Sequence, residues 1–390
     1  MNEKKAFIAL SVLTFSTLVT DRILFVLFPN YLIDRRFSPL EIGLIFSTAT
    51  LILLMFKTSI GKISDMMGRK TIMSLGLGIQ SISITLYTVM SSIAGFSMIR
   101  GLQSIGETLV DSVEDAFTGD LFSKKSRPRV VSRLGAVYAF ARVIAVIIGF
   151  IAITYFSINY GFYVAAIASV FSAIAFYFLI KQSKKAPRRH SLKIVLKPNF
   201  QKYSRAFYKL SFSGFLQELA FGIGISPTFF ILARKLGMSA SNIFLALLIS
   251  YVVNSVIIYL LNKKKGNLAT KHTYVYGLLI YSAGIAMYSL ATSSFQIFLL
   301  LPISTFGFYI FRIGHVVLLL DTIKPKMRGE QIGFSRTAAG VGQVIGPAIG
   351  GIVAQFVSLS LAFILAAAST FLASMVVKSI KKAEEKITGF

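Results

Sequence analysis

Charged and amide side chains recur on one face of an otherwise apolar stretch, residues 96–118. At about 100° per residue, five of them fall within an arc of about 80° on a helix. They are Arg100, Gln103, Glu107, Asp111 and Glu114. An ionisable group in an apolar segment costs several kcal/mol unless it is paired or hydrated, so such groups are functional candidates. The pattern predicts a ladder for protons or cations, with a structural ion-pair network as the alternative.

Other apolar stretches also contain polar side chains. Burial disfavours a charged carboxylate and a nearby arginine favours it, so a carboxylate can load and release a proton when its partner moves. We expect Asp21 to be the principal proton site, with Glu107, Asp111 and Glu218 shaping the site. Groups that could line a solute cavity, or simply tie helices together, are Arg22, Arg100, Gln103, Glu114, Tyr138, Arg142, Gln217, Asn254, Arg312 and His315.

The composition places these groups in a lipid bilayer. The chain is 55% apolar and 14% charged, with a mean hydropathy of +0.73, whereas soluble domains are about one quarter charged. A spanning helix needs about 20 apolar residues. Twelve stretches fit: residues 7–29, 39–60, 71–92, 96–118, 132–156, 160–181, 207–232, 241–262, 273–293, 296–319, 332–357 and 360–379.

The net charge of +26 is distributed as in a membrane protein. If the N-terminus is cytoplasmic, only four of the 41 Lys and Arg fall on the opposite side, namely Arg35, Arg36, Arg234 and Lys235. This is the positive-inside bias, so we expect both termini in the cytoplasm, a cytoplasmic-membrane location and no nucleic-acid partner. The basic linker at 182–206 could also lie against anionic lipid headgroups.

Several function classes lack the residues they require. The chain has no cysteine, which excludes disulfides and cysteine metal sites. Three histidines do not form a dense metal centre, and no phosphate loop, zinc-protease helix or nucleophile elbow is present. The first apolar stretch is too long for a signal-peptide core and predicts an uncleaved first span. We therefore expect no enzyme activity and no cofactor.

The two halves of the chain are related. Asp120, Lys125 and Arg127 recur 201 residues later as Asp321, Lys326 and Arg328, and Gly149 recurs as Gly350. The same offset places Asp111 opposite Arg312 and Glu114 opposite His315. Membrane carriers are commonly built from two related halves, so the duplication favours alternating-access transport over a continuous pore.

The segment between spans two and three contains a specific motif. Gly61, Asp65, Gly68, Arg69 and Lys70 lie in a stretch that we interpret as a tight cytoplasmic turn. With twelve spans and the repeat, this segment resembles the signature loop of the major facilitator superfamily, and the resemblance covers the whole chain. It implies an all-α membrane fold with two pseudo-symmetric six-helix bundles around a central cavity. The predicted parts are 1–181, the linker 182–206 and 207–390.

The resemblance also implies a role for this segment. In relatives the loop's aspartate faces the start of span eleven and its arginine meets an acid at the end of span four. By position, these partners are Arg336 and Asp120. Charge-assisted bonds between them would hold one carrier state shut on the cytoplasmic side. We call these seven residues, Gly61, Asp65, Gly68, Arg69, Lys70, Asp120 and Arg336, the cytoplasmic latch.

Span eleven contains a run of small residues, Gly342, Gly346, Pro347, Gly350 and Gly351. It resembles the glycine-proline motif that antiporters of the superfamily usually place in span five, but here it lies in the other half. Small residues four apart predict a close helix contact, which is the reading we favour.

These observations predict a monomeric twelve-helix secondary transporter that moves a small organic solute and protons. Asp21 and the high aromatic content, 35 Phe and 16 Tyr, favour proton-coupled export of amphipathic compounds. The alternative is a proton symporter that imports a sugar or carboxylate nutrient, which the acid ladder and Arg100 would serve equally well.

Overall fold

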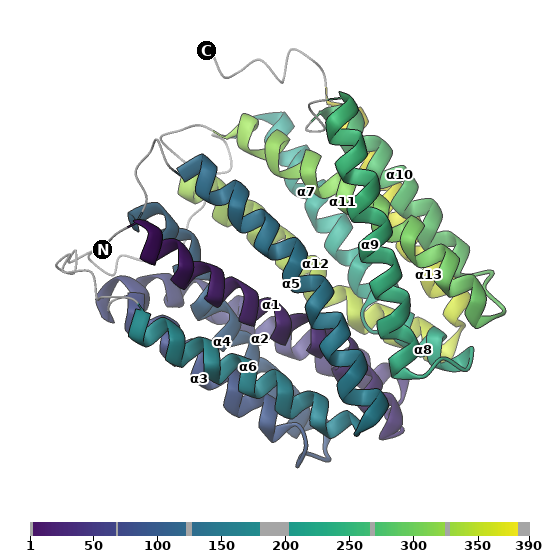
Figure 1. Ribbon diagram of the computed structural model, residues 1–390. Coiled ribbons are helices and arrows are strands. Elements are labelled where there is room, and N and C mark those ends of the chain that lie inside the picture. The colour runs from purple at the N-terminus through teal and green to yellow at the C-terminus, as the bar shows by residue number, and fades with distance from the viewer. Residues whose placement is uncertain are drawn as a thin grey trace. The chain divides into compact units, whose positions relative to one another are not determined.

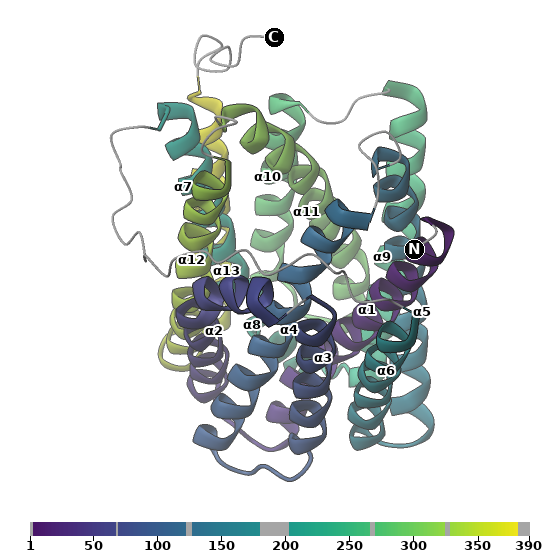
Figure 2. The ribbon, with the colours of Figure 1, turned by 90° about the vertical axis from the view of Figure 1, so that its left-hand side faces the viewer.

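A computed structural model describes residues 3–67, 69–121, 127–179, 203–265, 270–323 and 328–380. Within these residues the chain is helical and forms the twelve expected spans (Figures 1 and 2). The first half contains α1 (Glu3–Asp34), α2 (Pro39–Met67), α3 (Arg69–Leu86), α4 (Ile93–Leu121), α5 (Arg127–Tyr155) and α6 (Ile158–Leu179). The second contains α7 (Arg205–Ala220), η2 (Phe221–Ile225), α8 (Thr228–Lys235), α9 (Ala240–Lys265), α10 (Lys271–Tyr288), α11 (Ser294–Thr322), α12 (Arg328–Phe356) and α13 (Leu359–Lys378).

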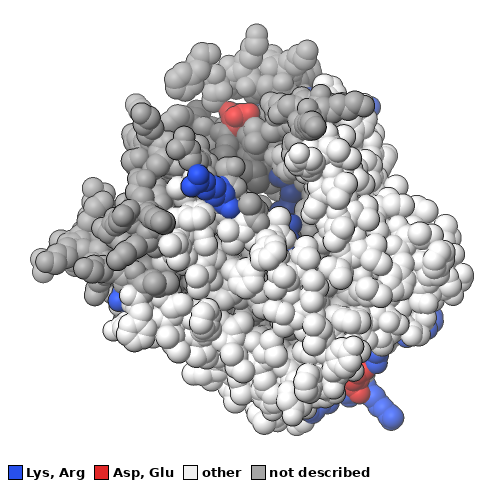
Figure 3. All heavy atoms as spheres, in the orientation of Figure 1, with Lys and Arg blue, Asp and Glu red and all other residues white. Residues whose placement is uncertain are grey.

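Most of these helices suit a bilayer. Among the described residues, nine helices are long and apolar enough to cross a membrane, counting α7, η2 and α8 as one. On the face shown in Figure 3, nearly all described atoms belong to uncharged residues. Helix α4 is not among the nine; its ladder of charged residues makes it less apolar than its neighbours.

The repeat in the sequence is also a repeat in the structure. Helices α4 and α11 begin and end 201 residues apart, as do α5 and α12. In the first half α3 packs against α4 and α6, and in the second half α10 packs against α11 and α13. Ser81 donates to the Ala166 carbonyl at 3.0 Å, and the equivalent Ser282 donates to the Ala367 carbonyl at 2.8 Å. The two halves therefore share both helix pairings and the hydrogen bonds between them.

The chain divides into two compact units whose bounds are not those of the two halves. The first comprises Met1–Tyr31, Thr48–Leu192 and Ala240–Leu248, and the second comprises Leu32–Ser47, Lys193–Ser239 and Ile249–Phe390. Thus the start of α9 belongs to the first unit and the start of α2 to the second. In the second unit, the backbone N–H of Leu40 donates to Gln355 Oε1 at 3.1 Å. In the first, a Cβ at Gly149 would lie 2.5 Å from the Phe244 ring. The predicted bundle boundaries stay a prediction.

Span seven is not the single α-helix that the sequence predicts. Helix α7 passes into the π-helical turn η2, where the N–H of Ser226 donates to the Phe221 carbonyl at 3.0 Å. Gly222 and Gly224 are weak helix formers and Pro227 has no N–H, so the regular ladder ends here. A Cβ at Gly222 would lie 2.6 Å from the side chain of Pro347. The break therefore lets η2 approach α12 closely.

The glycine run of α12 makes the close helix contact that its spacing predicts. A Cβ at Gly342 would lie 2.9 Å from the Leu219 nitrogen, and one at Gly346 would lie 2.7 Å from the Leu219 carbonyl oxygen. At Gly350 it would lie 2.5 Å from the Ile223 carbonyl oxygen. These glycines allow α12 to pack closely against α7 and η2, because larger side chains at these positions would collide with the backbone of α7 and η2.

A polar contact joins α7 and α12 at one end. Tyr203, just before α7, donates its hydroxyl to Glu330 Oε1 at 2.7 Å, and its ring packs against Phe207 and Phe334. Burial, with a smaller contribution from the bond to Glu330, raises the pKa of Tyr203 to about 12. The phenol therefore stays protonated and remains a donor at physiological pH.

Helices α3 and α4 pack closely at Gly76, and a substitution there measures how much this packing contributes to stability. A Cβ at Gly76 would lie 2.8 Å from both the Gly106 carbonyl oxygen and Leu109 Cβ, whereas a Cβ at Gly78 meets nothing within 4 Å. We expect Gly76→Ala to lower the unfolding free energy by about 1–3 kcal/mol. Gly78→Ala should leave it unchanged or raise it by up to about 1 kcal/mol. Thermal unfolding of both variants followed by circular dichroism checks this, and equal losses would contradict it.

Candidate transport site

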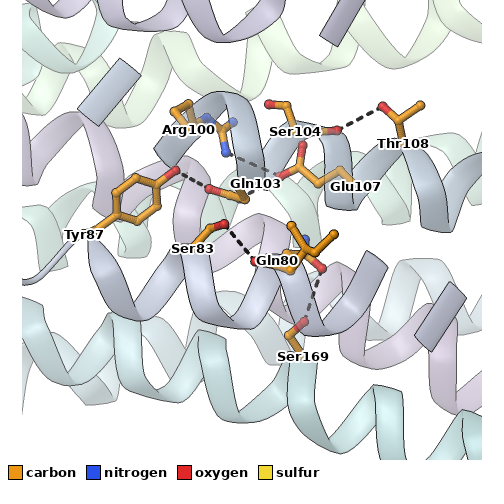
Figure 4. Close-up of polar contacts among 10 residues, drawn as sticks. Gln80, Ser83, Tyr87, Arg100, Gln103, Ser104, Glu107, Thr108 and Ser169 are labelled. Atoms are coloured by element: carbon orange, nitrogen blue, oxygen red, sulfur yellow. Dashed lines mark hydrogen bonds and ion pairs between the residues drawn. The ribbon is translucent and has the colours of Figure 1, made fainter. Parts of the chain in front are cut away.

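The charged residues predicted on one face of α4 come into contact. Arg100 Nη1 lies 3.4 Å from Glu107 Oε1, and Gln103 Nε2 donates to the same oxygen at 2.7 Å (Figure 4). The side chains of Arg100 and Glu107 are 22% and 29% exposed, and Gln103 is fully buried. Charge-assisted bonds of this kind are usually about 2.7–2.9 Å long. The amide of Gln103 is therefore at the distance of a strong bond to Glu107, and the guanidinium of Arg100 lies farther from the same oxygen.

Tyr87 on α3 orients this group, although the sequence pattern does not single it out. Its hydroxyl donates to Gln103 Oε1, so the amide nitrogen of Gln103 turns toward Glu107 (Figure 4). Tyr87 is fully buried, and its ring lies 4.5 Å from that of Phe28, whose face also lies under the Arg100 guanidinium at 5.6 Å. The internal repeat could have identified this tyrosine, because the Tyr87–Gln103 pair recurs 201 residues later as Tyr288–Ser304. There the Tyr288 hydroxyl lies 2.6 Å from Ser304 Oγ.

Helix α1 supplies a second acid to the same arginine. Asp21 acts electrostatically on Arg100 together with Glu107. Asp21 and the adjacent Arg22 are both partly buried. Arg100 is therefore influenced by carboxylates of two helices, and more strongly by Glu107 than by Asp21. The backbones of Asp111 and Glu114 lie further along α4, but their side chains are outside the described residues, so their pairing with Arg312 and His315 stays a prediction.

A second polar cluster lies in the other unit, where α7, α10 and α11 meet. Tyr274 Oη lies 2.7 Å from His315 Nδ1 and 2.9 Å from Ser213 Oγ, and it accepts from Gln217 Nε2. Gln217 also donates to Ser213 Oγ at 3.0 Å. Gln217 and His315 were predicted site residues, whereas Ser213 and Tyr274 were not. The helical periodicity of the sequence does not show which serine and tyrosine hydroxyls are buried between helices.

The other predicted residues described here lie on helices α5, α7, α9 and α11. Asn254 donates to Thr305 Oγ1 at 2.7 Å and thereby ties α9 to α11. Tyr138 and Arg142 are partly exposed on α5, and Glu218 on α7 acts electrostatically on Tyr281. Arg312 on α11 is exposed, and its guanidinium lies over the Phe308 ring at 5.5 Å.

The described part of the predicted latch segment is helical. Helix α2 continues to Met67 and α3 begins at Arg69, so Gly61 and Asp65 lie within α2. Lys70 lies over the Tyr177 ring at 4.1 Å, and Arg336 is exposed on α12. Gly68 and the side chains of Asp65, Arg69 and Asp120 are outside the described residues. The latch contacts therefore stay a prediction.

Twelve spans in two related halves, with paired charges inside them, define a multi-pass membrane protein of the duplicated carrier type. The family model of the Major Facilitator Superfamily matches residues 10–312 and 210–388, so the chain belongs to that superfamily and is a transporter of small molecules.

Relatives and solved structures agree with this membership. The chain is 26% identical to Multidrug resistance protein 2 of Bacillus subtilis (strain 168), over 83% of this chain and 82% of that protein. It is similar in fold to the nucleoside transporter NupG, with a TM-score of 0.75, 14% identity and coverage of 98% and 100%. It is also similar to the human organic anion transporter MFSD10, with a TM-score of 0.70, 14% identity and coverage of 97% and 100%.

The hydroxyl of Tyr87 is expected to stabilise the α3–α4 cluster. Tyr87→Phe leaves the buried Gln103 amide oxygen without its donor, which should lower the unfolding free energy by about 1–3 kcal/mol. Tyr160→Phe, at a side chain that is 53% exposed, is the matched control and should unfold like the parent. Thermal unfolding measures both, and identical transitions would show that the hydroxyl contributes nothing.

Proposed function

We propose that the chain exports amphipathic compounds across the cytoplasmic membrane in exchange for protons. The observation that carries this proposal is the contact of Arg100 with Glu107 on its own helix, together with the electrostatic influence of Asp21 on α1. Protonation of either carboxylate would change the electrostatic pull on the guanidinium. Ionisable groups inside an apolar span respond strongly to such a change, because they are poorly solvated there.

The proton changes the partner of the arginine. With Asp21 protonated, Arg100 pairs with Glu107, whose carboxylate also accepts from Gln103. With Asp21 ionised, the guanidinium is drawn toward α1, and Gln103 still holds Glu107. The 3.4 Å contact between Arg100 and Glu107 suits a pair that must open in every cycle. A proton thus biases two arrangements of the same side chains, which is what coupling requires.

Export is supported by the relative from Bacillus subtilis, whose name is Multidrug resistance protein 2. Import of a nutrient is the second candidate, and the likeness to the nucleoside transporter NupG favours it, although at 14% identity that likeness concerns the fold. We assign proton coupling to Asp21, Glu107, Asp111 and Glu218. We assign solute contacts to Arg22, Arg100, Gln103, Glu114, Tyr138, Arg142, Gln217, Asn254, Arg312 and His315.

Neutralising one carboxylate tests the coupling. In vesicles that contain the purified chain, Asp21→Asn should reduce transport of an amphipathic dye such as ethidium, driven by an imposed pH gradient, to background. Dye binding, measured as protection against thermal unfolding, should persist. Glu41→Gln is the control, because Glu41 accepts a bond from the Ser38 N–H at the start of α2, and an amide oxygen also accepts.

The same assay decides between the two candidates. Dye accumulation in vesicles with an acidic interior supports exchange, whereas solute entry together with protons from an acidic exterior supports the importer. Undiminished proton-driven transport in Asp21→Asn would remove Asp21 from the mechanism.

We further propose that the chain acts as a monomer with both termini in the cytoplasm. Because it contains no cysteine, single introduced cysteines report membrane sidedness without background. Arg35→Cys should react with a membrane-impermeant maleimide in intact cells, and Thr388→Cys should react only after permeabilisation. The physical reason is the excess of Lys and Arg on the side of the termini. The reverse labelling pattern would invert the topology.

A further inference from the structure

The hydrogen bonds around Tyr274 restrict where its proton can go. A phenol has one proton and two acceptor lone pairs. Gln217 Nε2 can only donate, so it occupies one lone pair of Tyr274 Oη. Ser213 Oγ and His315 Nδ1 then compete for the remaining lone pair and the proton, at 2.9 Å and 2.7 Å. Two arrangements are possible, and they differ in which nitrogen of His315 carries a hydrogen.

Ser213 distinguishes these arrangements. If Tyr274 donates to Ser213, the serine oxygen accepts from both Tyr274 and Gln217, and its own proton has no acceptor among the described residues. Ser213 is fully buried, and a buried polar group without a partner is disfavoured. If Ser213 donates to Tyr274 and Tyr274 donates to His315 Nδ1, every hydroxyl and amide hydrogen of the cluster is used, and the Nε2–H of the partly exposed imidazole is the one left over. The cluster therefore favours the neutral imidazole with its hydrogen on Nε2.

That Nε2–H is available to a ligand. His315 is partly exposed, and among the described residues its Nε2 has no hydrogen-bond partner. The ring packs over Gly214, where a Cβ would lie 3.8 Å from Nε2, so α7 supports the imidazole without covering it with a side chain. The donor thus belongs to a partly exposed side chain whose orientation is fixed by Tyr274.

The surroundings of His315 on α11 indicate what it would bind. Arg312 is one turn away on the same face, is exposed, and acts electrostatically on His315. Its guanidinium lies over the Phe308 ring, which also contacts Phe221 at 6.4 Å and Tyr281 at 5.7 Å between ring centroids. Among the described residues, Glu218 on α7 also acts electrostatically on Tyr281, one of these aromatic rings.

We propose that His315 Nε2–H, with Arg312 beside it, binds an acceptor oxygen of the transported solute, whose aromatic part packs on Phe308. The solute class is an aromatic compound with a carboxylate or carbonyl oxygen on or near the ring. This inference rests on the proposed function, because it deepens the solute side of the transport cycle. It does not depend on Asp21 or on proton coupling.

Two substitutions separate binding from structure. His315→Asn keeps an acceptor for the Tyr274 hydroxyl near the position of Nδ1 but removes the donor at Nε2. His315→Gln places an amide nitrogen near Nε2 and leaves the Tyr274 hydroxyl without its ring acceptor. A purely structural histidine predicts that Asn is tolerated and that neither variant changes binding. A solute-binding histidine predicts that Asn folds well and loses affinity, whereas Gln retains more of it.

The probes are benzoate, benzamide and benzylamine, tested by saturation-transfer NMR on the full purified chain without any gradient. His315→Asn should weaken benzoate about tenfold or more and benzamide about fivefold, and should leave benzylamine unchanged. Equal affinities of parent and His315→Asn for benzoate and benzamide would overturn the proposal, as would an equal loss for all three probes. A failure of gradient-driven transport with probe binding intact would count against the proposed function alone.

The proton position has its own test. The chain has only three histidines, so the ring ¹⁵N signals of His315 are assigned by their loss in His315→Asn. At a pH where the imidazoles are neutral, Nδ1 of His315 should show the shift of an unprotonated acceptor and Nε2 that of a protonated nitrogen. The opposite assignment would remove the donor on which the proposed site depends.

Discussion

Charge that is taken out of water must find compensating partners, and helix α4 supplies two of them, Gln103 and Glu107, from its own residues. Arg100, Gln103 and Glu107 are seven positions apart at most, so they share one face whatever the neighbouring helices do. The guanidinium and the carboxylate are only partly exposed, so neither is solvated as it would be in water. Everything else at this site, including Tyr87 behind the amide and Phe28 beneath the arginine, restricts how these two charges can face each other.

The two halves share their helix packing but differ in the charged residues that they contain. The pair Tyr87–Gln103 and its repeat Tyr288–Ser304 join equivalent helices by a hydroxyl bond. In the second half, however, Leu301 and Phe308 stand where the first half has Arg100 and Glu107. This charged pair therefore occurs in the first copy of the repeat and not at the equivalent positions of the second. The second half uses neutral groups around Tyr274 instead, which can stay buried without a counter-ion because each is hydrogen-bonded.

Helical periodicity is sufficient to bring Arg100, Gln103 and Glu107 together in a prediction, because all three lie on one element. It does not predict Tyr87 or Tyr274, whose roles depend on how α3 and α10 are rotated against their neighbours. Such rotation is decided by packing, for example by Gly76 against Gly106, and the chain has 16 tyrosines among which to choose. The break at η2 could in principle be predicted from Gly222, Gly224 and Pro227. The sequence near α2 and α9 does not predict that the start of α2 belongs to the second compact unit and the start of α9 to the first.

The packing of the helices also explains which contacts are free to change. Where α3 meets α4, and where α10 meets α11, glycine brings backbone against backbone: a Cβ at Gly106 would lie 2.7 Å from the Gly76 carbonyl oxygen, and one at Gly307 would lie 2.9 Å from that of Gly277. Such interfaces shift only with a large loss of contact, because packed interiors have little free space. The 3.4 Å contact between Arg100 and Glu107, by contrast, joins the ends of two long side chains, which can rotate without moving the backbone. A change of charge at this cluster is therefore relieved first by movement of long side chains, and helices move only when that movement no longer suffices.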